Sequence, residues 1–121
     1  MKETDMLADE FAACRKMLQA PGDENRQHLI LEMLRTGECG GVRVGAMAAR
    51  TNLSMPVVSR HLRILRDAGL IRVRREGAKN YYYFDADVRA MDSLLGMLNH
   101  ARAMMAALPG RGGQTENGEK K

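Results

Sequence analysis

Basic side chains suited to binding a polyanion are concentrated in residues 41–84. This segment carries nine basic residues but only Asp67 and Glu76 as acids, so its charge is +7, whereas the rest of the chain is −3. Such a cluster suits nucleic acid, although an acidic protein, a membrane surface or plain solvent would also accommodate it. The surrounding elements have to decide between these partners. The nine basic residues are Arg43, Arg50, Arg60, Arg63, Arg66, Arg72, Arg74, Arg75 and Lys79.

Two cysteines, Cys14 and Cys39, are the residues best suited to redox or soft-metal chemistry. Cys14 falls on an apolar stripe, which favours a small buried side chain. Cys39 lies in a glycine-flanked turn where Arg35 and Arg43 would stabilise a thiolate and Glu38 would oppose it. If dimerisation brings both thiols together, they can form a disulfide or persulfide bridge, or bind arsenite or another thiophilic ion with a third ligand. A structural role and a thiol switch both stay open.

Residue arrangements typical of catalysis are absent from the sequence. There is no glycine-rich phosphate loop, nucleophile elbow or zinc-hydrolase helix motif, and His28, His61 and His100 fall in different segments. The ten methionines recur at helical spacing, which favours adaptable packing over a soft-metal site. We therefore expect a binding protein that requires no cofactor, and not an enzyme.

The length and composition predict one small globular domain. The chain has 121 residues, of which 45% are hydrophobic and 28% charged. No apolar run approaches the roughly 20 residues that a bilayer crossing needs, and the first residues lack the layout of a signal peptide. We expect a cytoplasmic protein without a membrane partner, with a domain over 1–108 and a disordered polar tail over 109–121.

Helix signals divide the N-terminal third of the chain into two helices. Thr4 caps a helix to about Gln19, and the sequence Ala20-Pro21-Gly22 ends it. Asp23 then caps a second helix to about Arg35. Leu7, Phe11, Cys14 and Leu18 make one apolar stripe on the first helix, and Leu29, Ile30, Met33 and Leu34 are predicted to lie inward on the second.

A short third helix, a tight turn and a longer fourth helix follow. The third covers Val44 to Arg50, and Thr51-Asn52 turns the chain. Ser54 caps the fourth, which has Pro56 in its first turn and reaches about Ala68 before Gly69. The stripe that packs inward is Val58, Leu62 and Leu65, whereas Ser59, Arg60, Arg63 and Asp67 lie off it. One face of the fourth helix is therefore free for a ligand.

A hairpin and a last helix complete the expected fold. Residues Leu70 to Glu76 and Lys79 to Phe84 are rich in β-branched and aromatic side chains, and Gly77-Ala78 joins them. Asp85 or Asp87 caps a fifth helix to about Leu108. Its apolar stripe is wide enough to need a partner surface, and consists of Met91, Leu94, Leu95, Leu98, Ala101, Met105 and Leu108.

This order of elements predicts a mainly α (α+β) winged helix-turn-helix with about five helices and a two-stranded wing. In such a fold the second helix of the motif enters the DNA major groove, where Arg60 and Arg63 reach guanine edges or phosphates. The basic wing tip supplies contacts to the backbone or minor groove. The predicted DNA-binding residues are Ser54, Pro56, Ser59, Arg60, Arg63, Arg74, Arg75 and Lys79.

The sequence resembles the ArsR/SmtB family of bacterial repressors. The matching stretches are LSMPVVSRHLRILRDAGLI at 53–71 and RREGAKNYYY at 74–83, with an opening at Gly22 to Arg26 like the family's second helix. Ser59 and His61 match the family's serine-any-histidine signature, which adds His61 as a contact to DNA or to the helix-turn-helix scaffold. The resemblance spans about residues 22–108. It implies a homodimer built by the first and last helices, and release from DNA by a bound effector.

The two metal sites known in that family are incomplete here. Arg43 and Gly45 occupy the positions of the usual cysteine pair. For the site on the last helices only Asp87 and His100 match, since Arg89 and Ala103 replace the other two ligands. A dimer would have two such sites related by symmetry, so two ligands per subunit leave each site with fewer than the four that tetrahedral zinc usually has. Asp87 and His100 are therefore weak metal candidates.

Together these observations predict a sequence-specific DNA-binding transcriptional regulator, a homodimeric repressor that reads two half-sites of a near-palindromic operator. Its effector stays open between a thiol oxidant, a persulfide donor and a thiophilic metal ion. The alternative from a different class is a winged-helix module that binds protein and has no specific affinity for DNA.

Overall fold

In the part of the chain that the structure describes, six helices and a two-stranded hairpin follow one another in the order of a winged helix-turn-helix. The computed structural model of the chain describes residues 2–36 and 40–110. Its elements are α1 (Lys2–Ala13), α2 (Arg15–Gln19), the 3-10 turn η1 (Ala20–Gly22), α3 (Glu24–Thr36), α4 (Val44–Thr51), α5 (Met55–Asp67), β1 (Ile71–Glu76), β2 (Lys79–Phe84) and α6 (Arg89–Ala106).

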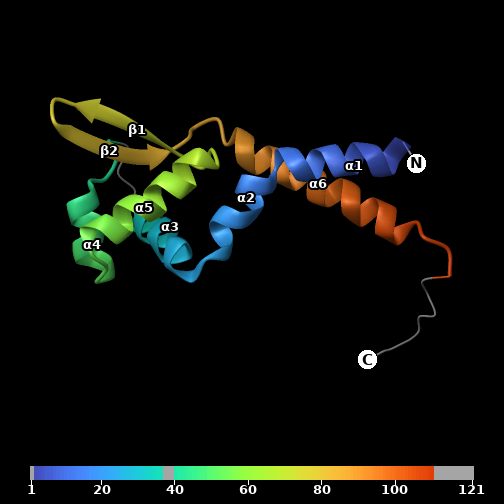
Figure 1. The fold of residues 1–121 in the computed structure, drawn as a ribbon, viewed down its shortest axis with the longest axis horizontal. Coiled ribbons are helices and arrows are strands. Elements are labelled where there is room, and N and C mark those ends of the chain that lie inside the picture. The colour runs from blue at the N-terminus through green and yellow to red at the C-terminus, as the bar shows by residue number, and fades with distance from the viewer. Residues whose placement is uncertain (1, 37–39, 111–121) are drawn as a thin grey trace.

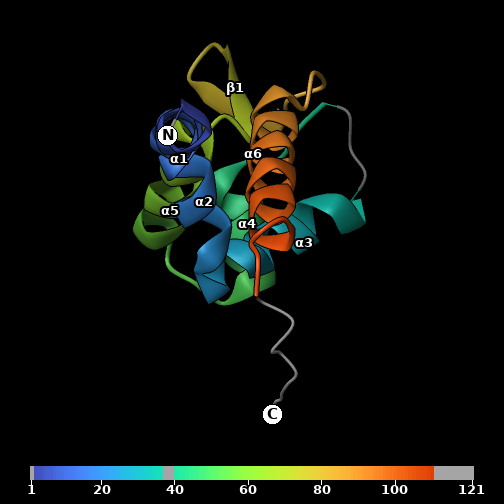
Figure 2. The same ribbon diagram turned by 90° about the vertical axis from the view of Figure 1, so that its right-hand side faces the viewer.

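The molecule is elongated and has two parts (Figure 1). At one end α3, α4, α5 and the hairpin form what we call the body. At the other end α1 and α6 pack side by side, and α2 packs against α6 as well. We call these three helices the arm; Figure 2 views the molecule from the arm's side, with α1 seen along its axis. The mainly helical fold with a two-stranded wing is confirmed.

The core of the body lies where the apolar stripes of α3, α4 and α5 meet. Leu29, Met47, Leu62 and Leu65 are fully buried there. Burying each such side chain stabilises the fold by about 1.5–3 kcal/mol. Leu34 is also predicted to lie inward, but it is 60% exposed, because it lies off the face of α3 that buries Leu29 and Met33.

Two of the four predicted helix caps are confirmed, those at Ser54 and Asp23. The Oγ of Ser54 accepts a hydrogen bond from the backbone N of Val57 at 3.3 Å, and the Oδ1 of Asp23 accepts one from the backbone N of Arg26 at 3.1 Å. These bonds satisfy amide groups that have no partner within the helix. The start of α5, which faces the proposed ligand, is therefore well defined.

The hairpin also pairs with Val42, in the segment just before α4. β1 and β2 pair antiparallel, with Val73 opposite Tyr82 and Glu76 opposite Lys79. The backbone N and O of Val42 exchange hydrogen bonds of 2.8 Å with those of Tyr82, adding a bridge to the sheet. Gly41 precedes it at φ +96°, where a Cβ would lie 2.8 Å from the Tyr82 carbonyl oxygen, so this approach needs glycine.

The first helix differs from the prediction of one continuous helix from Thr4 to Gln19. Thr4 lies inside α1, and the chain bends at Cys14, which separates α1 from α2. No glycine or proline occurs at the bend. The bend buries Cys14, Met17 and Ala20 at successive three-residue steps, so tertiary packing accounts for it.

The start of the last helix also differs from the prediction. Neither Asp85 nor Asp87 caps α6, because the N-cap is Val88 in a left-handed conformation at φ 47°. The Oδ1 of Asp85 instead accepts a hydrogen bond from the backbone N of Asp87 at 3.0 Å and shapes the preceding turn. The predicted tail falls mainly on residues 111–121, which lie outside the described residues.

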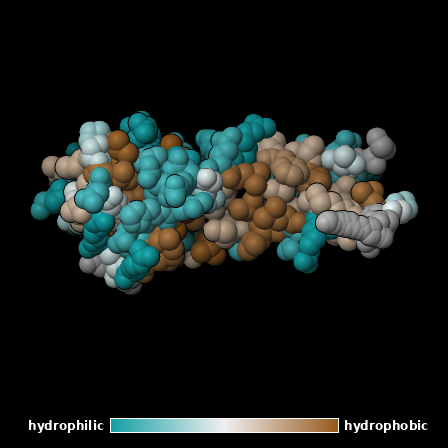
Figure 3. Space-filling model, turned by 90° about the horizontal axis from the view of Figure 1, so that it is seen from below, coloured by the Kyte–Doolittle hydropathy of each residue, from teal (hydrophilic) through white to brown (hydrophobic). Residues whose placement is uncertain are grey.

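The arm exposes large apolar side chains that none of the elements within residues 2–36 and 40–110 covers. Figure 3 shows hydrophobic residues gathered along the arm. Those on α1 and α6 are Met6, Phe11, Met91, Leu95, Leu98 and Met105, each at least 37% exposed. A continuous apolar face of this kind marks an interaction surface. Within the described ranges, no helix has the length and apolar composition needed to cross a membrane.

Candidate nucleic-acid interface

Helix α5 has one packed face and one free basic face. Its buried residues are Val58, His61, Leu62 and Leu65. Arg60 and Arg63, which are three residues apart and therefore on one side of the helix, are exposed, and Ser59 is half-buried beside them. This arrangement matches the predicted stripe and leaves both guanidinium groups free to contact a groove or a phosphate.

The N-terminus of α5 adds a second feature suited to an anion. Ser54 and Pro56 are both exposed at its first turn. Proline at this position removes an amide that would have no helical partner, and the remaining free amides carry partial positive charge. The Ser54 hydroxyl accepts from Val57, so its own hydrogen remains available to donate to a phosphate.

Two arginine side chains on the wing, Arg74 and Arg75, make contacts within the wing that the sequence did not indicate. The Nε of Arg74 lies 2.8 Å from the Oε2 of Glu76, and its guanidinium stacks 5.1 Å from the centre of the Tyr81 ring. The Nε of Arg75 donates to the Gly77 carbonyl oxygen at 2.9 Å. Lys79 is exposed at the tip. Glu76 therefore offsets part of the positive charge that the wing presents.

Arg43 and Arg50 belong to the same basic surface, and the prediction of individual contacts omitted them. A hollow of about 520 Å³ lies between α4, the start of α5 and the hairpin, and both arginines line it together with Met55 and Tyr81. Both side chains are exposed. Both arginines are among the nine basic residues of segment 41–84, but only the fold places them in a hollow next to the start of α5.

His61 lies on the inner face of α5, in the scaffold. It is 5% exposed, and its Nδ1 is 3.3 Å from the Nη1 of Arg26. Of the two roles predicted for it, this buried position fits the scaffold. Burial lowers the pKa of its imidazole, the Asp23 carboxylate partly offsets this, and the Arg26 and Arg60 cations lower it further.

The residues predicted as metal ligands are engaged elsewhere. The Nδ1 of His100 lies 2.6 Å from the Oε1 of Glu10, and the Oδ2 of Asp87 lies 3.5 Å from the Nη2 of Arg89. Across residues 2–36 and 40–110, no group of three or more His, Cys, Asp or Glu side chains could hold a metal ion. The sequence could not identify Glu10 as the partner of His100, because the two residues are 90 positions apart.

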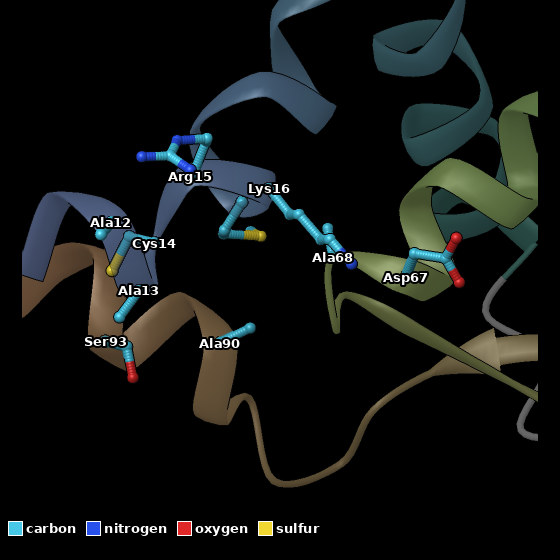
Figure 4. Close-up of a pocket in the computed structure, with 10 residues that line it drawn as sticks. Ala12, Ala13, Cys14, Arg15, Lys16, Asp67, Ala68, Ala90 and Ser93 are labelled. Atoms are coloured by element: carbon cyan, nitrogen blue, oxygen red, sulfur yellow. The ribbon is translucent and has the colours of Figure 1, made fainter.

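The thiol of Cys14 lines a cavity where the arm meets the body (Figure 4). The side chain is 5% exposed, and Lys16, Ala68 and Ser93 share the cavity, whose volume is about 300 Å³. Burial agrees with the predicted apolar position of this residue. The second predicted thiol, Cys39, lies outside the described residues.

Comparison with known proteins places this geometry in a family. Residues 25–73, from α3 into β1, match the family described as bacterial regulatory protein, arsR family. The chain is 35% identical over 83 residues to the transcriptional repressor SdpR of Bacillus subtilis, covering 69% of this chain and 87% of that protein. It is 32% identical over 79 residues to an uncharacterized HTH-type transcriptional regulator of Methanocaldococcus jannaschii, covering 65% and 85%.

A solved structure supports the fold. The homodimeric winged helix-turn-helix DNA-binding domain of a possible ArsR-family regulator from Mycobacterium bovis superposes with a TM-score of 0.55 at 23% identity, covering 88% of this chain and 92% of that one. The fold, the matched segment and the two relatives agree. The chain belongs to the arsR family of bacterial regulatory proteins, which are DNA-binding transcriptional regulators and not enzymes.

Proposed function

We propose that this protein is a homodimeric, cytoplasmic repressor that binds a near-palindromic DNA operator. The observation that carries the proposal is the exposed Arg60 and Arg63 pair on the free face of a helix whose other face is buried. In a helix-turn-helix that face enters the major groove, where arginine recognises guanine through two hydrogen bonds. The wing residues Arg75 and Lys79 supply contacts to the adjacent backbone.

The arm supplies the dimer contact. Its exposed apolar side chains on α1 and α6 would be buried by a second copy of the same face. A dimer places two copies of α5 about one helical turn of DNA apart, which requires an operator with two half-sites. The SdpR relative is named a repressor, and this supports the sign of regulation proposed here.

The effector proposed for this repressor acts through its thiols. Cys14 lines a cavity between the arm and the body, so a change at this sulfur would disturb the junction. A two-electron oxidant would convert Cys14 and Cys39 to a disulfide with the loss of two protons and two electrons to the oxidant. A persulfide donor RSSH would transfer its outer sulfur to one thiol and release RSH, and the second thiol would then displace hydrogen sulfide to form the same disulfide. We expect Cys14→Ser and Cys39→Ser to bind DNA when reduced and to lose the response to oxidant.

DNA binding is tested by fluorescence anisotropy of the reduced, metal-free protein on duplex DNA from upstream of its own gene, with scrambled duplex as competitor. We expect tight binding to the native duplex that weakens steeply with salt. Arg60→Ala and Arg63→Ala should each reduce it by about 1–3 kcal/mol, whereas Arg89→Ala, an exposed arginine on the arm, should not.

Two results would contradict the proposal. Equal affinity for native and scrambled duplex would favour the protein-binding alternative. Unchanged affinity in both α5 variants would remove α5 from the interface.

A further inference from the structure

We infer that Arg26 is a positioning residue that holds the arm at a fixed angle to α5, and so sets the separation of the two recognition helices in the dimer. Arg26 lies in the first turn of α3, away from the exposed face of α5. The inference rests on the proposed function, because a separation matters only if two copies bind one operator.

The side chain of Arg26 links the end of α2, where the arm begins, to α5, the helix proposed to bind DNA. Its Nε donates to the Ala20 carbonyl oxygen at 2.7 Å, and its Nη2 donates to that of Gln19 at 3.4 Å. These oxygens end α2 and begin η1, where the arm enters the body. Its Nη1 lies 3.3 Å from the Nδ1 of His61 on α5. One guanidinium therefore connects the base of the arm with the recognition helix.

The junction depends on this link because part of it is hollow. η1 packs against α3 and α5, whereas α1 and α2 pack against α6. Between α2 and the end of α5 lies the cavity of about 300 Å³ shown in Figure 4, with Cys14 and Lys16 on one side and Asp67 and Ala68 on the other. At this point α2 is therefore separated from the end of α5, and the start of α6 meets it only where Ala90 lies beside Gly69. Directional bonds at η1 add a restraint on the angle of the arm.

Arginine suits this position because its planar guanidinium offers five N–H donors in fixed directions. It reaches two carbonyls and an imidazole at once, and a single lysine ammonium could not span the same three acceptors. Arginine only donates, so the Nδ1 of His61 must accept, which requires a neutral ring with its proton on Nε2. The capping bond that the Arg26 amide donates to the Oδ1 of Asp23 fixes the backbone from which the side chain extends.

The functional consequence is avidity. When one subunit of a dimer binds its half-site, the second subunit is held near the other half-site at a high effective concentration, which raises the affinity for the whole operator. This gain is lost if the geometry of the dimer keeps the second subunit from reaching its half-site. A loosened arm would leave each α5 able to bind its half-site. The dimer would then hold an intact operator less tightly, and would discriminate less between half-site spacings.

The test uses full-length Arg26→Gln, with Arg35→Gln as the matched control. Arg35 is on the same helix and is 63% exposed, and its guanidinium pairs with Glu32, so the control removes the same charge without touching η1 or α5. Each protein is titrated with the operator duplex, with a duplex that carries one half-site, and with operators whose spacing is changed by one or two base pairs.

We expect Arg26→Gln to bind the single half-site within about twofold of the wild type, and the intact operator about tenfold or more weakly, with a flatter dependence on spacing. Equal losses on both duplexes would mean that Arg26 only stabilises the fold, and no loss would mean that it has no positioning role; either result overturns the inference. A wild type without preference for any duplex would instead refute the proposed function.

A second variant keeps the test decisive if Arg26→Gln does not fold. His61→Leu removes only the acceptor on α5 and leaves the bonds of Arg26 to Ala20 and Gln19 in place. We expect the same selective loss on the intact operator. An unchanged ratio of operator to half-site affinity in this variant would overturn the inference.

Discussion

Glu10 of α1 and His100 of α6 form a 2.6 Å contact between Oε1 and Nδ1, which joins the two long helices of the arm. The histidine that the sequence marked as a weak metal candidate is thus a structural link between the two helices proposed to form the dimer contact. Its side chain is 22% exposed and that of Glu10 39%, so solvent screens the pair only in part.

The variant His100→Ala is expected to lower the free energy of unfolding by about 1 kcal/mol, the usual net value of one hydrogen bond. Urea denaturation of His100→Ala and of Asn99→Ala, an exposed neighbour on the same helix, measures the difference. Zinc should leave the DNA affinity of the wild type unchanged. A zinc-dependent affinity that His100→Ala abolishes would restore the metal role.

The buried imidazole of His61 predicts a loss of stability in mild acid. Burial lowers its pKa from the usual 6.5, so the unfolded chain binds a proton more readily than the folded one. Stability is therefore complete above about pH 6.5 and decreases as the pH falls below that value toward the lowered pKa. Asp23, whose pKa is lowered mainly by the hydrogen bond from the Arg26 amide, adds a loss in the same direction only below pH 3.8.

Urea unfolding at pH 7.5, 6.0 and 5.0 measures this dependence. We expect His61→Leu to flatten it and His28→Ala, an exposed histidine on α3, to leave it unchanged. Identical slopes in the wild type and His61→Leu would show that other groups cause the acid loss.

The bridge between Val42 and Tyr82 predicts a strict requirement for glycine at position 41. In Gly41→Ala the new Cβ would lie 2.8 Å from the Tyr82 carbonyl oxygen, at a φ of +96° that costs a non-glycine residue about 1–3 kcal/mol. We expect a loss of stability of about 2 kcal/mol or more, and faster amide exchange at Val42 and Tyr82. Gly40→Ala, whose Cβ meets nothing within 4 Å, should change little. Equal stability of both variants would contradict the close approach.

If the exposed apolar face of α6 forms the dimer contact, a single charged side chain introduced there should prevent dimerisation. Leu98 is 47% exposed in the single chain, so Leu98→Glu should fold normally but place an unpaired carboxylate in the dimer contact. Sedimentation equilibrium should show a dimer for the wild type and a dissociation constant raised about tenfold or more for the variant. Asn99→Glu is the control for added charge at an adjacent exposed position. A wild type that stays monomeric would refute the dimer contact itself.

The wing predicts changes in the salt dependence of DNA binding without changes in sequence preference. Arg75→Ala or Lys79→Ala should reduce the slope of log affinity against log salt by about 1. Glu76→Gln should raise the affinity, because it removes a negative charge and releases Arg74 from a 2.8 Å contact. Anisotropy titrations at four salt concentrations test all three variants. A lower affinity for Glu76→Gln would show that Glu76 positions Arg74 for DNA.

Local sequence signals determined most of the body. Ser54 and Asp23 cap their helices as predicted because a capping side chain bonds to amides only two or three residues away. Gly77 and Ala78 turn the hairpin, and the stripe of Val58, Leu62 and Leu65 orients α5, because alternation and helical period are properties of a short segment. The exposed position of Arg60 and Arg63 follows from that stripe, so the candidate interface was predictable in its main part.

Tertiary structure alone decided how the parts are joined. The bend at Cys14, the contact of Glu10 with His100 and the reach of Arg26 from α3 to His61 have no local signal, because each depends on segments far apart in the chain meeting in space. The same holds for Arg43 and Arg50, which reach the candidate interface only when α4 packs beside the hairpin. Sequence by itself determined which helix face is free to bind DNA. Packing decided how the arm is held relative to that face, since a bond across 35 residues exists only after the core has formed.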